Sequence, residues 1–119
     1  MELFLIFDNM IDSSSGGIRG AANARHLLFH SDAWDLDIMV ARSSEMIQVA
    51  GQVLPRGAAD LSSLFNAVAV LSEAVGEDEL VQSTRLSARG EFEFRDVPES
   101  TLRIEIFLKA HQLTASFKP

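Results

Sequence analysis

The sequence predicts an all-β fold, an antiparallel sandwich of roughly seven to eight strands preceded by an apolar N-terminal strand. Three observations favour this class. Apolar and polar residues alternate in several short runs, which is the period of a strand with one buried face. Turn-forming residues separate these runs at intervals of about 8–12 residues, a spacing typical of sandwiches and barrels. No segment between them has the character of the crossover helices that a parallel sheet requires.

The first element, residues 1–12, is an apolar arm. If it is extended, Leu3, Leu5 and Phe7 lie on one face while Phe4 and Ile6 lie on the other, so both faces are largely apolar. Such a strand must be covered, and three arrangements stay open: packing within its own sandwich, docking on another copy, or burial against an upstream domain. These five residues are the candidate interaction strand.

Residues 13–25 are expected to be a linker. Three serines and two glycines at 13–17 predict a flexible connection, and residues 18–25 can hold a short helical turn. The arm has no basic region before its apolar run, and the run is too short to cross a bilayer. We therefore expect a soluble chain without a signal peptide or membrane insertion, with the cytoplasm favoured unless the chain is a fragment of an envelope protein.

The sandwich is expected over residues 26–119, with strands identified by their alternating apolar sets. Runs at 68–70 and 80–86 are further strands, and residues 58–65 form a loop or helical turn. Met39 and Phe107 interrupt the polar faces of their strands, and we expect a loop to cover them rather than a partner or the arm. The alternating sets are Trp34, Leu36, Ile38 and Val40; Ile47, Val49, Gly51 and Val53; Phe92 and Phe94; Leu102, Ile104, Ile106 and Leu108; and Leu113, Ala115 and Phe117.

The amino-acid composition argues against some classes of function. The chain has 119 residues, 47% of them hydrophobic, and no cysteine, so one core can form without disulfides. The 17 acidic and 10 basic side chains give a formal net charge of −7. This charge repels phosphate backbones, and we expect no nucleic-acid partner.

About half of the chain resembles a known family. The similarity is to carboxypeptidase regulatory-like domains, a branch of the transthyretin-like β-sandwiches, and it implies an Ig-like or transthyretin-like fold. Known members are non-catalytic attachments that aid folding, docking or recognition. The chain departs from the pattern at Leu102, where many members carry Tyr, and at Glu99-Ser100, where a Gly usually follows the Pro. The matching residues are Gly51-Gln52-Val53, Val68-Ala69-Val70, Thr84, Gly90-Glu91-Phe92-Glu93-Phe94, Val97-Pro98 and Leu102-Arg103-Ile104.

A second resemblance is to the C-terminal domain of uncharacterised bacterial proteins that accompany extracytoplasmic-function sigma factors. In those proteins a zinc-finger anti-sigma segment often precedes the domain, whereas this chain has no cysteine to form one. The resemblance implies an accessory role in a sigma/anti-sigma-linked regulatory protein. It rests on Phe7-Asp8, Gly17-Ile18-Arg19, Arg25-His26-Leu27-Leu28-Phe29, Asp35-Leu36-Asp37, Gly51-Gln52-Val53-Leu54 and Gly90-Glu91-Phe92.

Asp32, Asp35 and Asp37 are the densest acidic group and suggest a calcium site. Their spacing departs from the EF-hand loop, however. Asp35 and Asp37 share a strand face about 7 Å apart and repel each other unless Arg or Lys lies across from them. A solvated strand face is the simpler interpretation.

His26, His30 and His111 invite a metal or acid–base interpretation. Along a strand the first two lie about 13 Å apart, too far for one ion, and they become neighbours only in a helix. Ordinary surface histidines are the simpler interpretation.

The sequence contains no Gly-x-Ser-x-Gly elbow and no glycine-rich nucleotide motif. Glu91 and Glu93 alternate with phenylalanines on an exposed face rather than forming a catalytic pair. We therefore expect no enzyme, no cofactor and no metal, but a non-enzymatic interaction or docking module with a protein partner. Two alternatives stay open: a self-assembling subunit that donates its N-terminal strand to another copy, and a calcium-dependent binding domain.

Overall fold

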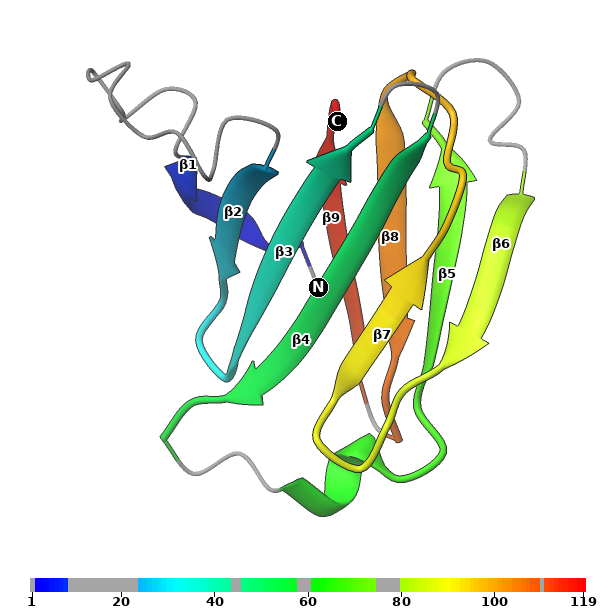
Figure 1. Ribbon diagram of the computed structural model, residues 1–119. Coiled ribbons are helices and arrows are strands. Elements are labelled where there is room, and N and C mark those ends of the chain that lie inside the picture. The colour runs from blue at the N-terminus through cyan, green and yellow to red at the C-terminus, as the bar shows by residue number, and fades with distance from the viewer. Residues whose placement is uncertain (1, 9–23, 44–45, 58–60, 75–79, 110) are drawn as a thin grey trace.

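The computed structural model describes residues 2–8, 24–43, 46–57, 61–74, 80–109 and 111–119, which form two antiparallel sheets packed face to face (Figure 1). A short 3-10 helix, η1 (Leu61–Leu64), connects them. In the five-stranded sheet the order is β1 (Phe4–Asp8), β2 (Ala24–His30), β3 (Trp34–Arg42), β4 (Ile47–Pro55) and β7 (Glu91–Phe94). In the four-stranded sheet it is β6 (Leu80–Arg85), β5 (Val68–Glu73), β8 (Leu102–Phe107) and β9 (Gln112–Phe117).

The predicted all-β class is confirmed, with β2 to β9 as the body of the sandwich and β1 as the arm. The first body strand begins at Ala24 rather than His26. The helical turn expected over residues 18–25 lies outside the described residues, except for its last two positions, which belong to β2. No helix among the described residues is long and apolar enough to cross a membrane.

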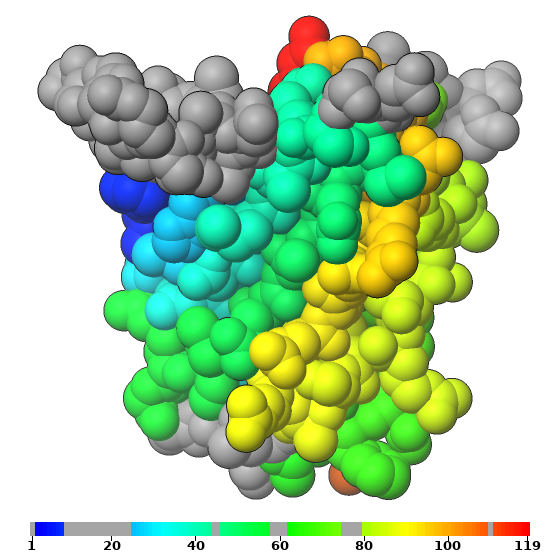
Figure 2. All heavy atoms as spheres, viewed as in Figure 1, coloured from blue at the N-terminus to red at the C-terminus, as the bar shows by residue number. Residues whose placement is uncertain are grey.

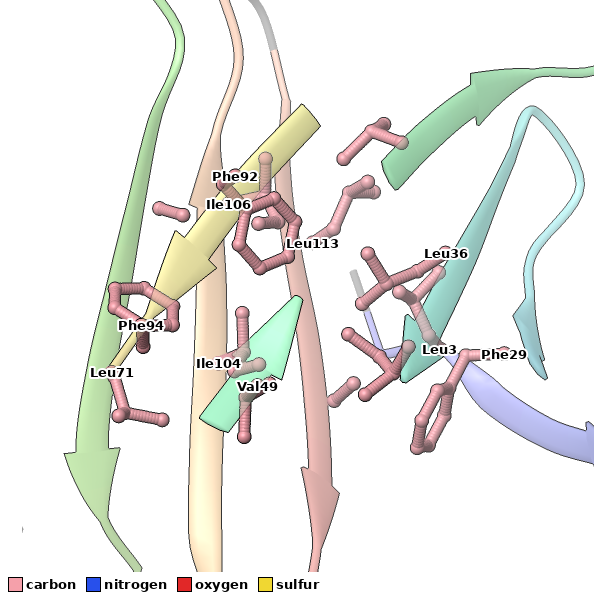
Figure 3. Packing of buried hydrophobic residues seen from close by; sticks show 14 of the residues in the cluster. Leu3, Phe29, Leu36, Val49, Leu71, Phe92, Phe94, Ile104, Ile106 and Leu113 are labelled. Atoms are coloured by element: carbon pink, nitrogen blue, oxygen red, sulfur yellow. The ribbon is translucent and has the colours of Figure 1, made fainter. Parts of the chain in front are cut away.

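The core lies between the sheets and is built from the alternating apolar residues (Figure 3). In β3, Trp34 and Leu36 are buried while Asp35 and Asp37 lie on the opposite, outer face. In β5 the sequence indicates Val68 and Val70 as the apolar set, but these two side chains are only half buried, and Ala69 and Leu71 lie in the core instead. Burial of these apolar surfaces between two sheets is the main force that holds the fold together.

Two glycines of the resemblance pattern have structural roles here. Gly51 in β4 lies opposite Phe92 in β7, and a Cβ at this glycine would lie 2.3 Å from the ring carbon Cζ. Gly90 has a φ of +81°, and a Cβ there would lie 2.5 Å from the carbonyl oxygen of Val53. Glycine at position 51 therefore lets β4 approach β7, and glycine at position 90 lets the turn before β7 approach β4.

The N-terminal segment links the two sheets. The Leu3 amide donates a 2.8 Å hydrogen bond to the carbonyl of Thr114 in β9, and the Leu3 side chain is buried in the core. The chain then enters β1, which pairs with β2 of the other sheet. The arm therefore packs in part on its own sandwich.

On the far side of the sandwich, Gln82 of β6 donates a 2.5 Å hydrogen bond to the carbonyl of Arg95, next to β7.

Met39 and Phe107 correct one expectation. Both side chains are exposed, at 45% and 42% of their surface, so the prediction that a loop covers them is wrong within the described part of the chain. Met39 lies on the outer face of the five-stranded sheet, and Phe107 lies near Phe65 beside η1. These positions therefore add to the exposed apolar surface of the sandwich.

Candidate functional site

The arm presents a continuous run of exposed apolar side chains. Phe4, Leu5, Ile6 and Phe7 are exposed at 66%, 45%, 55% and 37% of their surface. Figure 2 shows β1 in dark blue at the margin of the molecule, beside β2. The structure therefore divides the predicted interaction strand: Leu3 is a core residue, and the other four residues face solvent.

β1 is the edge strand of its sheet. It pairs antiparallel with β2, and the pairing places Phe4 opposite His30 and Phe7 opposite Leu28. The register shifts between Leu5 and Phe7, so Ile6 is an extra residue on the bulged strand. An edge strand has one row of backbone N–H and C=O groups without a neighbouring strand, which another strand can pair with.

The other three edges of the two sheets are better protected. The β9 edge is covered in part by Glu2 and Leu3. β6 and β7 lie beside each other, and they carry the exposed charged residues Arg85, Glu91 and Glu93. Charged side chains and neighbouring chain segments are the usual protection of sheet edges. Within the described residues, β1 is therefore the edge with the longest exposed apolar run.

A buried ion pair holds the end of β1 in place. Asp8 is 3% exposed and accepts hydrogen bonds from Arg25 Nε at 3.1 Å and Arg25 Nη2 at 2.6 Å. Arg25 also donates to the main-chain carbonyl of Lys118, just after β9. One guanidinium therefore ties β1, β2 and the end of β9 together.

The predicted acidic group does not gather at one point. Asp37 Oδ1 lies 2.5 Å from His26 Nε2, and Asp35 Oδ1 lies 3.5 Å from His30 Nδ1, whereas Asp32 is exposed in the turn before β3. Because β2 is a strand, its two histidines are separated along it and lie near different carboxylates.

A basic side chain that lessens the repulsion between Asp35 and Asp37 lies near Asp35, where Arg56 Nε is 3.7 Å from Oδ1. His111 is exposed between β8 and β9. Among the residues that the structure describes, no group of three His, Cys, Asp or Glu side chains could hold a metal ion. Asp32, Asp35 and Asp37 therefore do not form such a group.

The outer face of the five-stranded sheet has an open hollow of about 670 Å³ that includes Met39, Gln52 and Glu93. Glu93 Oε1 accepts a 2.7 Å hydrogen bond from Arg95 Nε, and this bond is the main cause that lowers the pKa of Glu93. Asp37, at the other side of the hollow, is paired with His26. Glu93 thus forms a surface ion pair with Arg95, and Asp37 lies within hydrogen-bond distance of His26.

Sequence reasoning missed the surface that flanks β1. Phe7 makes an edge-to-face contact with the ring of His26, with centroids 5.6 Å apart, and Leu28 lies across from Phe7 on the same outer face. The signal was present, because His26, Leu28 and His30 alternate with the buried Leu27 and Phe29. The site therefore combines the β1 edge with the outer face of β2.

No family model, curated protein or solved structure matches the chain. The resemblances to carboxypeptidase regulatory-like domains and to sigma-factor-associated domains stay predictions.

Proposed function

We propose that the chain is a non-enzymatic protein-interaction module that binds an extended apolar strand of a protein partner along β1. The observation that carries the proposal is the run of four exposed apolar residues, residues 4–7, on an edge strand without an exposed charged residue between them. The resemblance to bacterial accessory domains supports a place in a sigma/anti-sigma-linked regulatory protein.

Binding would add a strand to the five-stranded sheet. The backbone groups of residues 4–7 that face no other described strand would form hydrogen bonds with the added strand, and its side chains would cover the exposed apolar ones. Phe4 and Phe7 lie across from outer-face residues of β2, so an apolar residue of the partner can pack beside them. The bulge at Ile6 shortens the regular pairing, so we expect moderate affinity.

The test uses a labelled heptapeptide of alternating valine and threonine with lysine at both ends, followed by fluorescence anisotropy. We expect a dissociation constant of about 10–100 μM, which corresponds to about −5.5 to −7 kcal/mol. Ile6→Glu should weaken binding at least tenfold, because a charge on the edge opposes strand addition.

Phe65→Glu is the matched control, because Phe65 is also exposed, at 78%, and the substitution changes the net charge equally. It should bind the peptide like the wild type. A peptide methylated on its backbone nitrogens should bind weakly, since it lacks the donors. Equal binding by both variants, or no binding by the wild type, would contradict the proposal.

One observation favours a second candidate, a self-assembling subunit that donates its N-terminal strand. The segment that contains Glu2 and Leu3 contacts β9, and the following β1 contacts β2. The same contacts could form with the β9 and β2 of another copy, as in domain swapping. Such a dimer would exchange subunits slowly, because each exchange withdraws the buried Leu3 and breaks the ion pair of Asp8 with Arg25.

A further inference from the structure

We propose that a hollow beside η1 binds a small aromatic carboxylate. This η1 hollow is bordered by the segment from Ser62 to Val68 and by residues 107–109, at the end of the sandwich where η1 and the turn after β8 lie (Figure 1). Its volume of about 580 Å³ falls within the range of roughly 300–1,000 Å³ that is usual for small-molecule sites. The hollow lies away from β1, so this inference does not rest on the proposed function.

The walls of the η1 hollow are largely apolar. The rings of Phe65 and Phe107 line it while they are 78% and 42% exposed. Val68 of β5 lies directly opposite Phe107 of β8 and shares its sheet face, and the buried Leu108 also contributes to the lining. Aromatic rings pack well against another ring in offset or edge-to-face arrangements. A flat aromatic ligand therefore suits these walls.

The fold holds Phe65 at the surface. Its neighbours Leu64 and Ala67 are buried, at 2% and 1% exposure, and the Ala67 amide donates a 3.1 Å hydrogen bond to the Leu64 carbonyl. Asn66, between Phe65 and Ala67, has a φ of +61°, a left-handed conformation that asparagine tolerates better than most residues. This turn anchors the chain on both sides of Phe65, so the hollow is formed before a ligand arrives.

Lys109 gives the η1 hollow its charge preference. Among the described residues that line the hollow, Lys109 is the only charged one, and its side chain is exposed. The chain as a whole has a formal charge of −7, so a hollow with this lysine differs in sign from the molecule around it. A ligand with an apolar body and one negative group complements both the walls and the lysine.

The neighbouring strands support the same preference. Arg85 of β6 is exposed and lies directly opposite Val68, which puts a second cation one strand away from the hollow. Glu105 lies on the same face of β8 as Phe107, but its carboxylate accepts a 2.6 Å hydrogen bond from Gln112 Nε2. The same carboxylate lies 3.8 Å from Arg103 Nε. An anionic ligand thus meets basic side chains and a carboxylate that is already engaged.

A compound such as 2-naphthoate matches this arrangement. Its rings would pack between Phe65 and Phe107, and its carboxylate would accept a hydrogen bond from the Lys109 ammonium. Because both phenylalanine rings are partly exposed, a bound ligand stays partly in water. We therefore expect a dissociation constant of about 0.1–1 mM.

NMR titration of the isotope-labelled full chain with 2-naphthoate tests the site. Amide shifts should centre on residues 62–68 and 107–109. The neutral analogue 2-naphthamide should bind about two- to fivefold more weakly, which is the range expected from loss of one exposed ion pair. Equal binding of the two compounds, or no binding at about 10 mM naphthoate, would overturn the inference.

Lys109→Gln tests the role of the lysine. This variant should bind 2-naphthoate only as well as 2-naphthamide, while its affinity for 2-naphthamide stays that of the wild type. Lys118→Gln is the matched control, because Lys118 is also exposed and follows the far end of β9, about 20 Å along the strand from Gln112. Lys118→Gln should keep the preference for naphthoate. Equal effects of the two substitutions would mean that Lys109 does not select the ligand.

Phe107→Ala tests the apolar wall. It should weaken both compounds by a similar factor, because it removes a ring and no charge. Unchanged amide shifts in the five-stranded sheet would show that this variant is folded, and unchanged affinity in the folded variant would contradict the site.

Ile6→Glu separates this site from the β1 edge. The variant should bind 2-naphthoate like the wild type, because Ile6 lies in the other sheet. Weakened naphthoate binding by Ile6→Glu would overturn the inference. A wild type that binds the valine–threonine peptide but not naphthoate would refute this inference and leave the proposed function standing. The opposite result would refute the proposed function and support the η1 hollow.

Discussion

Arg25 in β2 makes contacts with two distant parts of the chain, and these contacts explain why β1 stays attached to the sandwich. Its guanidinium bonds Asp8 in β1 and the carbonyl of Lys118 after β9. Neither contact could be predicted from the sequence, where Arg25 was assigned to the linker. The partners are 17 and 93 residues away along the chain, and alternation identifies the face of a strand but not its distant neighbours.

We predict that Arg25→Ala lowers the free energy of unfolding by about 3 kcal/mol, because it leaves the buried Asp8 carboxylate without two strong donors. Urea unfolding measures the change. Arg95→Ala is the matched control, since Arg95 is 74% exposed in its pair with Glu93, and it should leave the midpoint unchanged. Equal effects of the two substitutions would show that the Asp8 pair does not anchor β1.

The aspartate and histidine pairs show what local reasoning could reach. The sequence predicts correctly that Asp35 and Asp37 share a strand face and that His26 and His30 lie on a strand rather than a helix. It does not predict that these two sets pair, because that requires the antiparallel register of β2 with β3. The register follows from the tight turn between the two strands, in which the Ser31 hydroxyl accepts a hydrogen bond from the Trp34 amide.

At the scale of the element, β1 departs from the regular alternation that the sequence suggests. Leu3, Leu5 and Phe7 were expected on one face, but Leu3 lies in the core and Phe7 lies on the outer face beside His26. Two causes produce the difference: the chain changes sheets after Leu3, and a bulge at Ile6 shifts the register. A period of two describes a strand only while its pairing is regular.

Leu3 and Leu5 therefore differ in their effect on stability. We predict that Leu3→Ala costs about 2–5 kcal/mol of unfolding free energy, because it leaves a cavity between the sheets. Leu5→Ala, at a side chain that is 45% exposed, should cost much less. Urea unfolding of both variants measures the difference. Similar costs would mean that Leu3 is not part of the core in solution.

This difference also determines how the arm should be tested. Removing the whole arm would remove Leu3 and Asp8 together with the exposed residues, so a change in association could follow from lost stability. Substituting Ile6, which is 55% exposed, alters the edge and leaves the core intact.

At the scale of the whole molecule, composition and alternation were sufficient for the fold class and for the core positions of β3, β7, β8 and β9, but not for Leu27 and Phe29 in β2 or for the core side of β5. They were not sufficient for the strand order. β7 pairs with β4 rather than with its sequence neighbour β6, and β5 lies between β6 and β8. These choices depend on packing between the sheets, such as the fit of Phe92 over Gly51. That β1 is an edge strand of the described sheets could therefore be identified only from the structure.

The proposed binding site lies at the β1 edge of the sandwich, and residue-resolved NMR tests this placement most directly. The valine–threonine peptide is titrated into isotope-labelled protein. We predict that amide shifts are confined to β1 and the facing residues of β2, with slower hydrogen exchange in β1 when peptide is bound. Shifts centred on Phe65 and Phe107, or on the hollow around Met39, would contradict the account.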